Sequence, residues 1–241
     1  EENVTTILEG LRQVAPGTAF DFVDQGWDPR NMDPAKVAEA EKRAKEADLN
    51  IVVAGEYMMR FRWTDRTDGE DTDRSDLDLV GLQNELIRKV AASGKPTILI
   101  LVNGRPLGVE WAAEHLPAIV ETWAPGMYAG QAVAEILYGK VNPSAKLAIT
   151  IPRSVGQLQM IYNHKPSQYF HPYAVKPSTP LWPFGYGLSY TTYKYDDLKL
   201  SAKEVSQNQN VEVSVKVTNT GQRDGVEIVQ LYIRDKYSSV T

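Results

Sequence analysis

The chain of 241 residues is long enough for one large domain or two smaller ones, and 42% hydrophobic with 24% charged residues is an ordinary globular balance. It contains no cysteine, which excludes disulfides, thiolate metal sites and cysteine nucleophiles. The net charge of −5 comes without a basic run, and no apolar stretch reaches the roughly 20 residues of a membrane helix. We therefore expect a globular protein with neither nucleic acid nor a membrane among its partners.

The N-terminal part begins as two helices followed by a strand. Val4 to Val14 carries apolar residues at helical spacing. Asp33-Pro34 is a helix start, because Asp can cap the helix and Pro suits its first turn, and the helix is expected over Ala35 to Ala47. Asn50 to Ala54 then reads as a short buried strand.

The same alternation continues along the chain. Residues 82–94 show a helical pattern that ends at a Ser-Gly pair. Thr97 to Val102 is apolar throughout, as parallel strands are, and Ala118 to Thr122 reads as a third strand. Gly130 to Tyr138 is expected to be helical, and Leu147 to Ile151 closes the pattern. Helices and strands in alternation predict an α/β fold with a mostly parallel sheet sandwiched by helices.

The composition predicts three parts along the chain. Residues 1–151 form the α/β domain, and residues 152–193, rich in Pro and aromatic residues, form a connector packed on it. In residues 194–241, Val211 to Thr218 alternates apolar and polar side chains, and Glu227 to Arg234 reads as a second strand. Because a seven-strand sandwich needs about 100 residues, we expect here only the start of an all-β sandwich, and the chain to be a piece of a longer protein.

The segment most informative about function is the loop of residues 56–80. It has no clear periodicity, and loops of this length are usually functional or disordered. It follows a predicted parallel strand, and ligands of open α/β sheets bind beyond the carboxyl ends of strands. The loop combines carboxylates, guanidinium groups and aromatic rings, carried by Glu56, Arg60, Phe61, Arg62, Trp63, Asp65, Arg66, Asp68, Glu70, Asp71, Asp73, Arg74, Asp76 and Asp78.

This combination suits a carbohydrate site. Sugar hydroxyls need donors and acceptors, the C–H face of a sugar ring stacks on an aromatic ring, and one carboxyl group could protonate a glycosidic oxygen. The composition is equally typical of a solvated surface loop, and the residues alone leave both interpretations open. A calcium loop is not indicated, because the EF-hand pattern fails from both Asp71 and Asp76. We expect no metal and no cofactor.

A second polar segment, Asn103-Gly104-Arg105-Pro106, directly follows the strand predicted over Thr97 to Val102. It therefore also lies at the carboxyl end of a strand. Gly104 permits a tight turn, and Arg105 can pair with carboxylates of the 56–80 loop. A turn with a purely structural Arg explains the motif as well.

Taken together, these segments resemble glycoside hydrolase family 3, in particular its bacterial periplasmic β-glucosidases. The matching motifs occur in the family's order; they include Gly55-Glu56, Gly94-Lys95-Pro96, Asn103-Gly104-Arg105-Pro106, Glu121-Thr122-Trp123, Asn142-Pro143-Ser144, Pro152-Arg153-Ser154-Val155-Gly156-Gln157, the ten residues Pro183 to Thr192, and Thr218-Asn219-Thr220-Gly221. Any one of these motifs is modest, whereas so many in order form a specific signal.

The resemblance implies a division of labour between domains. In the family a (β/α)8 barrel carries the nucleophilic Asp, and an α/β sandwich supplies the acid/base Glu on a loop. A fibronectin type III-like sandwich follows. The resemblance implies hydrolysis of terminal β-D-glucosyl residues from oligosaccharides or glucosides with retention of configuration, in the periplasm or outside the cell. It also implies that an N-terminal barrel, in the same or a companion chain, is the partner of this one.

The resemblance also indicates site residues. In the periplasmic β-glucosidase subgroup the loop reads Glu, three residues, Arg, one residue, Asp and an aliphatic residue, and Glu70 to Leu77 fits that register. Glu70 is thus implied to be the catalytic acid/base, with Glu56 in support. Further residues implied to bind substrate or support the site are Arg60, Arg62, Trp63, Arg74 and Asp76.

Two features leave alternatives open. Arg60 to Gly69 is longer than the family pattern, which would let the loop reach a neighbouring subunit, so a homodimer is one expectation. β-Xylosidases belong to the same family, and nothing in the sequence separates them from β-glucosidases. A non-catalytic carbohydrate-binding or interaction module is the alternative from another class.

Overall fold

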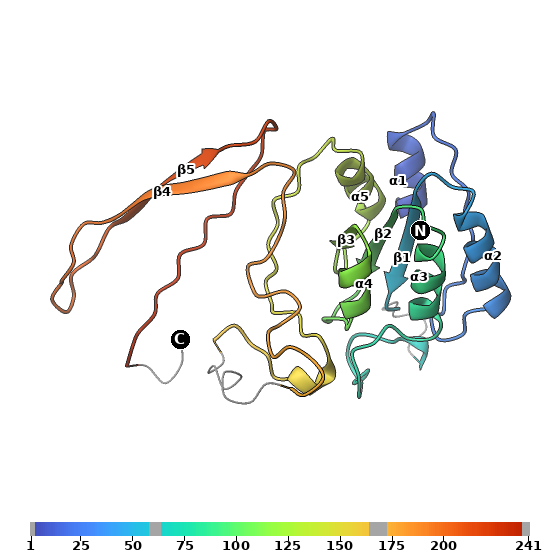
Figure 1. The fold of residues 1–241 in the computed structure, drawn as a ribbon, viewed down its shortest axis with the longest axis horizontal. Helices are drawn as coiled ribbons and strands as arrows, with labels where there is room; N and C mark the ends of the chain where they lie inside the picture. Colours follow the sequence, from blue (N-terminus) through green and yellow to red (C-terminus); the bar gives the residue numbers. More distant parts are fainter. Residues whose placement is uncertain (1–2, 58–63, 164–172, 238–241) are drawn as a thin grey trace.

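The structure is a computed structural model that describes residues 3–57, 64–163 and 173–237. A layered unit of helices around a sheet lies at one end, and a long two-stranded ribbon lies at the other (Figure 1). Irregular chain joins the two. Among the described residues, no helix is long and apolar enough to cross a membrane.

The sheet of the layered unit has three parallel strands in the order β1-β2-β3. They span Asn50–Gly55, Thr97–Val102 and Ala118–Glu121. In register, Asn50 lies opposite Thr97, and Ile98 lies opposite Ala118. The three apolar runs of the sequence are therefore the strands, and the prediction of a parallel sheet is confirmed.

The central strand β2 is covered on both faces. Its residues Leu99 and Leu101 belong to the apolar core that also holds Val37 and Ile87. Ile100 points to the opposite face, because side chains alternate along a strand, and it too is 0% exposed. This explains why β2 is apolar at every position after Thr97 rather than at every second one.

Helices pack on this sheet and on one another. The helices α2 (Pro34–Ala44) and α3 (Gln83–Ala91) contact each other; α3 also contacts β1 and β2, and α4 (Glu110–His115) contacts β3. The remaining helices, α1 (Ile7–Val14) and α5 (Ala129–Leu137), pack closely against each other.

Local sequence signals explain two of these helices. The Asp33 side chain accepts a hydrogen bond from Ala35 N at 2.8 Å, and Pro34 occupies the first turn of α2. Helix α1 begins with a capping box between Thr6 and Glu9. A Cβ atom at Gly10 would lie 2.0 Å from the carbonyl oxygen of Gly130, so α1 and α5 approach more closely than any other residue would permit.

One expectation about the α/β unit is wrong. Leu147 to Ile151 does not add a strand to the parallel sheet; Ile151 forms an isolated antiparallel bridge with Trp182. Leu147 N donates to Tyr186 O at 2.8 Å, so the main chain of this segment pairs with the Pro- and aromatic-rich stretch instead. That stretch is largely irregular, with a single short 3-10 turn, Val155–Gln157, among its described residues.

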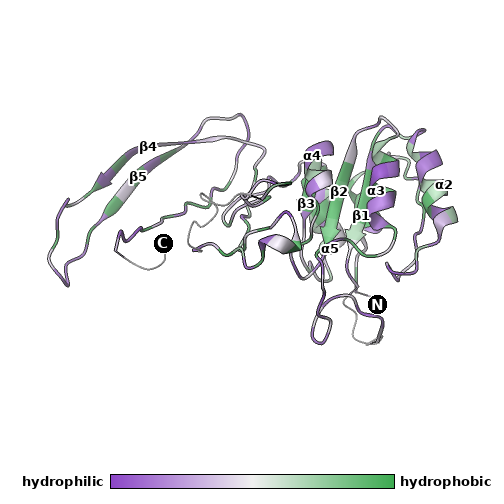
Figure 2. Ribbon diagram, turned by 60° about the horizontal axis from the view of Figure 1, so that its bottom comes forward, coloured by the Kyte–Doolittle hydropathy of each residue, from purple (hydrophilic) through white to green (hydrophobic). Residues whose placement is uncertain are grey.

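The C-terminal ribbon consists of β4 (Tyr193–Leu200) and β5 (Val213–Asn219), which pair antiparallel. The alternation in the sequence predicted β5, but the second strand expected over Glu227 to Arg234 is wrong. A strand needs a hydrogen-bonded neighbour, and within the described residues this segment has no ladder partner. Apolar side chains remain exposed along the ribbon and the chain that follows it, and Figure 2 shows their hydropathy; they include Leu198, Val226, Leu231 and Ile233.

Candidate functional site

The polar segments that follow the three parallel strands meet at one edge of the sheet. Residues 56–80 leave β1, Asn103 to Pro106 leaves β2, and Glu121 to Trp123 leaves β3. Glu56 N donates to Val102 O at 2.9 Å, and Asn103 N donates to Trp123 O at 3.2 Å. The strand pairing thus extends one step into these segments, which places their side chains together at the expected ligand-binding edge.

The base of the 56–80 loop is a buried charge cluster, formed by the side chains of Glu56, Asp68, Arg74 and Arg105. The Glu56 side chain is 0% exposed, and its Oε1 atom lies 3.2 Å from Arg74 Nη1 and 3.2 Å from Arg105 Nε. The Arg105 Nε–H is not aimed along a hydrogen bond, so this second contact is an ion pair only. The other oxygen, Oε2, is buried without a hydrogen-bond partner.

The electrostatics of Glu56 follow from this burial. Burial raises the pKa of the Glu56 carboxyl, and the negative charge of Asp68 raises it further. The positive charges of Arg105 and Arg74 act in the opposite direction and only partly offset the loss of water. Glu56 therefore holds the cluster together while remaining sealed from solvent.

Arg105 is the most connected member of the base. Its Nη2 atom lies 3.0 Å from Asp68 Oδ1, 3.3 Å from Thr67 O and 3.0 Å from Thr72 O. Asp68 itself is only 7% exposed. A Cβ atom at Gly104 would lie 1.9 Å from Asp68 Oδ2, so the chain after β2 must be glycine there to let the loop pack against it.

The tip of the loop, residues 69–73, is exposed apart from the half-buried Thr72. Arg66, which is buried, donates to the main-chain oxygen of Glu70 at 2.6 Å, so the backbone under Glu70 is fixed. Within the described residues, no hydrogen bond or ion pair holds the Glu70 carboxylate, and Glu70 is exposed. Asp71 adopts a left-handed backbone with φ of 60°, which turns the chain at the tip.

The structure brings Arg74 and Asp76 together, as two of the residues that the sequence indicated. Arg74 Nη2 donates to Asp76 Oδ1 at 2.7 Å and also to the main-chain oxygen of Asp78. The Arg74 side chain is 12% exposed and that of Asp76 is 52% exposed. Three other indicated residues, Arg60, Arg62 and Trp63, lie outside the described residues.

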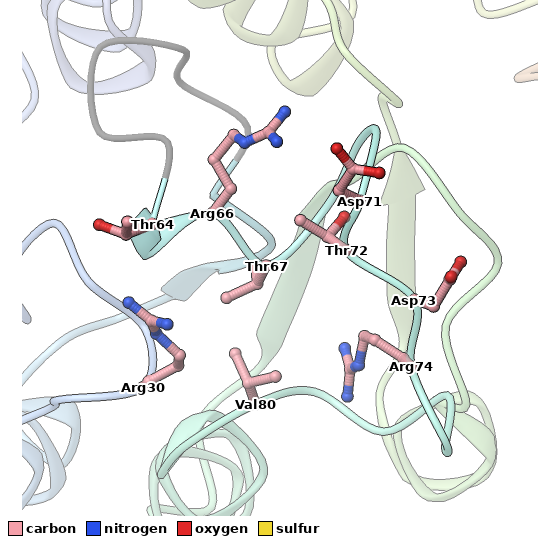
Figure 3. A pocket seen from close by; sticks show the side chains of 9 residues that line it. All are labelled: Arg30, Thr64, Arg66, Thr67, Asp71, Thr72, Asp73, Arg74 and Val80. Atoms are coloured by element: carbon pink, nitrogen blue, oxygen red, sulfur yellow. The ribbon is translucent and has the colours of Figure 1, made fainter.

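A pocket of about 370 Å³ lies beside the tip, between the loop and the chain before α2 (Figure 3). Its lining mixes guanidinium, carboxylate and hydroxyl groups, and comprises Arg30, Thr64, Arg66, Thr67, Asp71, Thr72, Asp73, Arg74 and Val80. No signal in the sequence pointed to Arg30, because it precedes the loop by 26 residues. It pairs with Asp28 at 3.1 Å and with Asp65 at 3.7 Å, which ties the two sides of the pocket together.

A second carboxyl group, the half-buried Glu121, lies at the end of β3. Glu121 Oε1 accepts a hydrogen bond from Trp123 N at 2.9 Å, and Asn103 Nδ2 lies 3.4 Å from Oε2. Burial raises the pKa of Glu121, and these two hydrogen bonds counteract the effect. Among the described residues, no group of three His, Asp or Glu side chains is arranged to hold a metal ion.

Known proteins are similar to this chain over nearly its whole length. A β-xylosidase from Formosa agariphila is 41% identical over 239 residues, covering 98% of this chain and 32% of that protein. The periplasmic β-glucosidase of Salmonella typhimurium is 39% identical over 224 residues, covering 89% of this chain and 28% of that protein. A solved β-glucosidase structure from Erythrobacter marinus matches with a TM-score of 0.86 at 37% identity, covering 98% of this chain and 34% of that one.

The chain thus spans about a third of the length of the relatives it matches, at 32% and 28% for the two curated ones. The family model described as the glycosyl hydrolase family 3 C-terminal domain matches residues 1–190. That match covers the parallel sheet, its helices, the loop of residues 56–80 and the irregular stretch after it. The chain therefore belongs to glycosyl hydrolase family 3, within the C-terminal domain of that family.

Proposed function

We propose that the protein containing this chain hydrolyses terminal β-D-glucosyl residues with retention of configuration, and that Glu70 is its general acid/base. The observation that carries this proposal is the placement of Glu70. Its carboxylate is exposed at the tip of a loop whose base is fixed by buried ion pairs at the ligand-binding edge of a parallel sheet. A general acid needs such a combination of access and fixed position.

Glu70 suits this role better than Glu56, Asp68 and Asp76 of the same loop. A general acid must come within about 2.6–3.2 Å of the oxygen that it protonates. Glu56 and Asp68 cannot, because the first is fully buried and the second is 7% exposed and held by Arg105. Asp76 is accessible but is engaged by Arg74 at 2.7 Å.

In the proposed mechanism the catalytic groups come from two domains. An Asp of the barrel attacks the anomeric carbon, while Glu70 donates a proton to the departing glycosidic oxygen. Glu70 then removes a proton from the incoming water, which releases the glucose and restores both groups. Retaining enzymes place their two carboxyl groups about 5–5.5 Å apart, so the barrel must cover the tip of the loop. No step requires a cofactor.

The pocket beside the tip supports a role in binding the sugar or its leaving group. Arginine and threonine donors alternate there with aspartate acceptors, which matches the mixed needs of sugar hydroxyls. We propose that Arg74 and Asp76 support this binding, together with Arg60, Arg62 and Trp63 of the same loop. Glu56 supports the site from beneath by orienting Arg74.

The remaining parts of the proposal follow from the family. We propose that the chain works in the periplasm or outside the cell, with the N-terminal barrel in the same or a companion chain, and that residues 194–241 begin a fibronectin type III-like sandwich. The exposed apolar side chains of the ribbon favour such a continuation, because an unpaired apolar strand edge invites aggregation. The same argument allows a second copy of the protein to cover it.

A β-xylosidase is the second candidate function. The observation in its favour is that the Formosa agariphila relative, 41% identical over nearly the whole chain, is a β-xylosidase. Comparing kcat/KM for matched aryl β-glucosides and β-xylosides in the full-length protein decides between the two. Hydrolysis of neither would favour a non-catalytic module.

The test of the acid/base role uses Glu70→Gln in the full-length protein. An alkyl glucoside needs the proton, so its hydrolysis should fall by about 10²- to 10⁴-fold. An aryl glucoside with a good leaving group should still form the glycosyl-enzyme and then stall, and azide should restore its turnover. Glu114→Gln, on the exposed side of α4, is the matched control and should behave like the unaltered protein. Equal losses on both substrates without azide rescue would remove Glu70 from the role.

A further inference from the structure

We infer that Arg105 is a positioning residue for Glu70, holding the acid/base loop at its working place on the sheet. This inference rests on the proposed function, because it assigns Arg105 a role that acts through the proton transfer of Glu70. The other interpretation of the Asn103 to Pro106 motif is a turn in which Arg105 is purely structural. Unlike that interpretation, the inference requires that changes at Arg105 affect catalysis.

The contacts of Arg105 bracket Glu70 along the chain. Its Nη2 atom contacts Thr67 O and Asp68 Oδ1 on one side of Glu70, at 3.3 Å and 3.0 Å, and Thr72 O on the other side at 3.0 Å. One guanidinium group thus holds together the two ends of the tip, Thr67 and Asp68 on one side and Thr72 on the other, which we call the neck of the loop. Glu70 can move relative to the sheet only if these contacts break.

Arg105 is itself held rigidly. It is the third residue after β2, the central strand, and its main-chain oxygen accepts a hydrogen bond from Asn103 Nδ2 at 2.8 Å. Asn103 is 0% exposed. The guanidinium also pairs with the buried Glu56 at 3.2 Å, which links it to the end of β1. Arg105 therefore fixes the position of the tip relative to two strands of the sheet, β1 and β2.

The arrangement needs a guanidinium group rather than any positive charge. Arg105 contacts Glu56 through Nε and the neck of the loop through Nη2, two different nitrogens of one planar group. A lysine ammonium is a single point charge and cannot serve both places at once. Arg105→Lys should thus keep the charge while loosening the neck. Geometric errors of about 1 Å around a catalytic group lower rates by about 10²-fold.

The experiment is a double-mutant cycle in the full-length protein, with the single variants Arg105→Lys and Glu70→Gln and the double variant. The readout is kcat/KM for an alkyl glucoside and for an activated aryl glucoside. If Arg105 acts through Glu70, Arg105→Lys should lower the alkyl rate by about 10- to 100-fold and the aryl rate far less. In the Glu70→Gln background the same change should have almost no further effect on the alkyl substrate.

The matched control is Arg153→Lys, because Arg153 also pairs with a carboxylate, Glu110 at 3.0 Å, and is similarly covered, with 17% of its side chain exposed against 21% for Arg105. It lies outside the loop and should leave the alkyl-to-aryl ratio unchanged. If Arg105→Lys does not fold, Asp68→Asn removes one contact of the same neck and should show the same pattern more weakly.

The outcomes separate the two claims. Equal losses on both substrates, or a loss that adds fully to that of Glu70→Gln, would show that Arg105 is merely structural and would overturn the inference. If Glu70→Gln itself shows no dependence on the leaving group, the proposed function fails, and the inference fails with it.

Discussion

The base and the tip of the 56–80 loop contain the same kinds of charged residues in opposite settings. At the base, Glu56 and Asp68 are buried and bound by Arg74 and Arg105. At the tip, the carboxylate of Glu70 is exposed and unbound within the described residues. The difference teaches that the buried carboxylates fix the loop, whereas the carboxylate of Glu70 stays accessible, as the acid/base role that we propose for it requires. Residue type alone would not distinguish the two settings.

The largest expected difference between base and tip is in the stability of two single variants, Glu56→Ala and Glu70→Ala. Glu56→Ala leaves two partly or fully buried guanidinium groups without one of their acceptors and opens a cavity, and it should destabilise the domain by about 2–4 kcal/mol. Glu70→Ala should change stability by no more than about 0.5 kcal/mol, as expected for an exposed site. Thermal unfolding midpoints of the full-length variants measure both effects.

Glu56→Gln is the internal control for that prediction. It keeps an oxygen for the two arginines and places an amide where Oε2 has no partner, so it should cost less than the alanine change. Similar midpoints for Glu56→Ala and the unaltered protein would contradict the role assigned to the base.

A smaller effect is expected from Gly104→Ala, which displaces Asp68 at the base of the loop without removing a charge. The new Cβ would lie 1.9 Å from Asp68 Oδ2, so Asp68 must move and the neck of the loop with it. Hydrolysis of an alkyl glucoside should fall by about 10-fold or more. Gly17→Ala, where nothing lies within 4 Å of the added atom, should have no effect on the same assay.

The smallest effect concerns the pH dependence of stability at the end of β3. Because burial raises the pKa of Glu121, the folded state binds more protons than the unfolded state above the unfolded pKa of about 4.3. Stability from this group is therefore fully present at low pH and is lost as pH rises through the folded pKa. Glu121→Gln removes the titrating group, so the stability of this variant should fall less as pH rises. Its free energy of unfolding should therefore lie further below that of the unaltered protein at pH 4 than at pH 7. A deficit that grows with pH would reverse the sign of the argument.

Much of the fold was predictable from its apolar runs, because parallel strands covered on both faces are apolar at nearly every position. Thr97–Val102 has the predicted bounds, and Asn50–Gly55 differs by one residue. The expectations for Leu147 to Ile151 and Glu227 to Arg234 failed because pairing partners are not encoded locally. Leu147 and Ile151 hydrogen-bond to residues 30 or more positions away, in the aromatic stretch.

The site was predictable in part. The length of the loop and its place after β1 pointed to residues 56–80, and the register with the family singled out Glu70. The sequence could not show which acidic residues are buried, so Asp68 was not distinguished from its neighbours. The sequence did indicate that Arg105 can pair with carboxylates of this loop, and its ion pairs with Glu56 and Asp68 confirm that interpretation. It could not show that Arg105, 35 positions after Glu70, closes the neck of the loop, because that contact exists only once β1 and β2 pair.

The central claim, that Glu70 is the acid/base, is tested most directly by the product that Glu70→Gln forms from an activated aryl β-glucoside in the presence of azide. Azide needs no general base, and it should attack the glycosyl-enzyme from the face that water normally uses. The account predicts that β-glucosyl azide accumulates, identified by NMR of its anomeric proton, while the unaltered protein gives glucose. Absence of glycosyl azide, or formation of the α-anomer, would contradict the account.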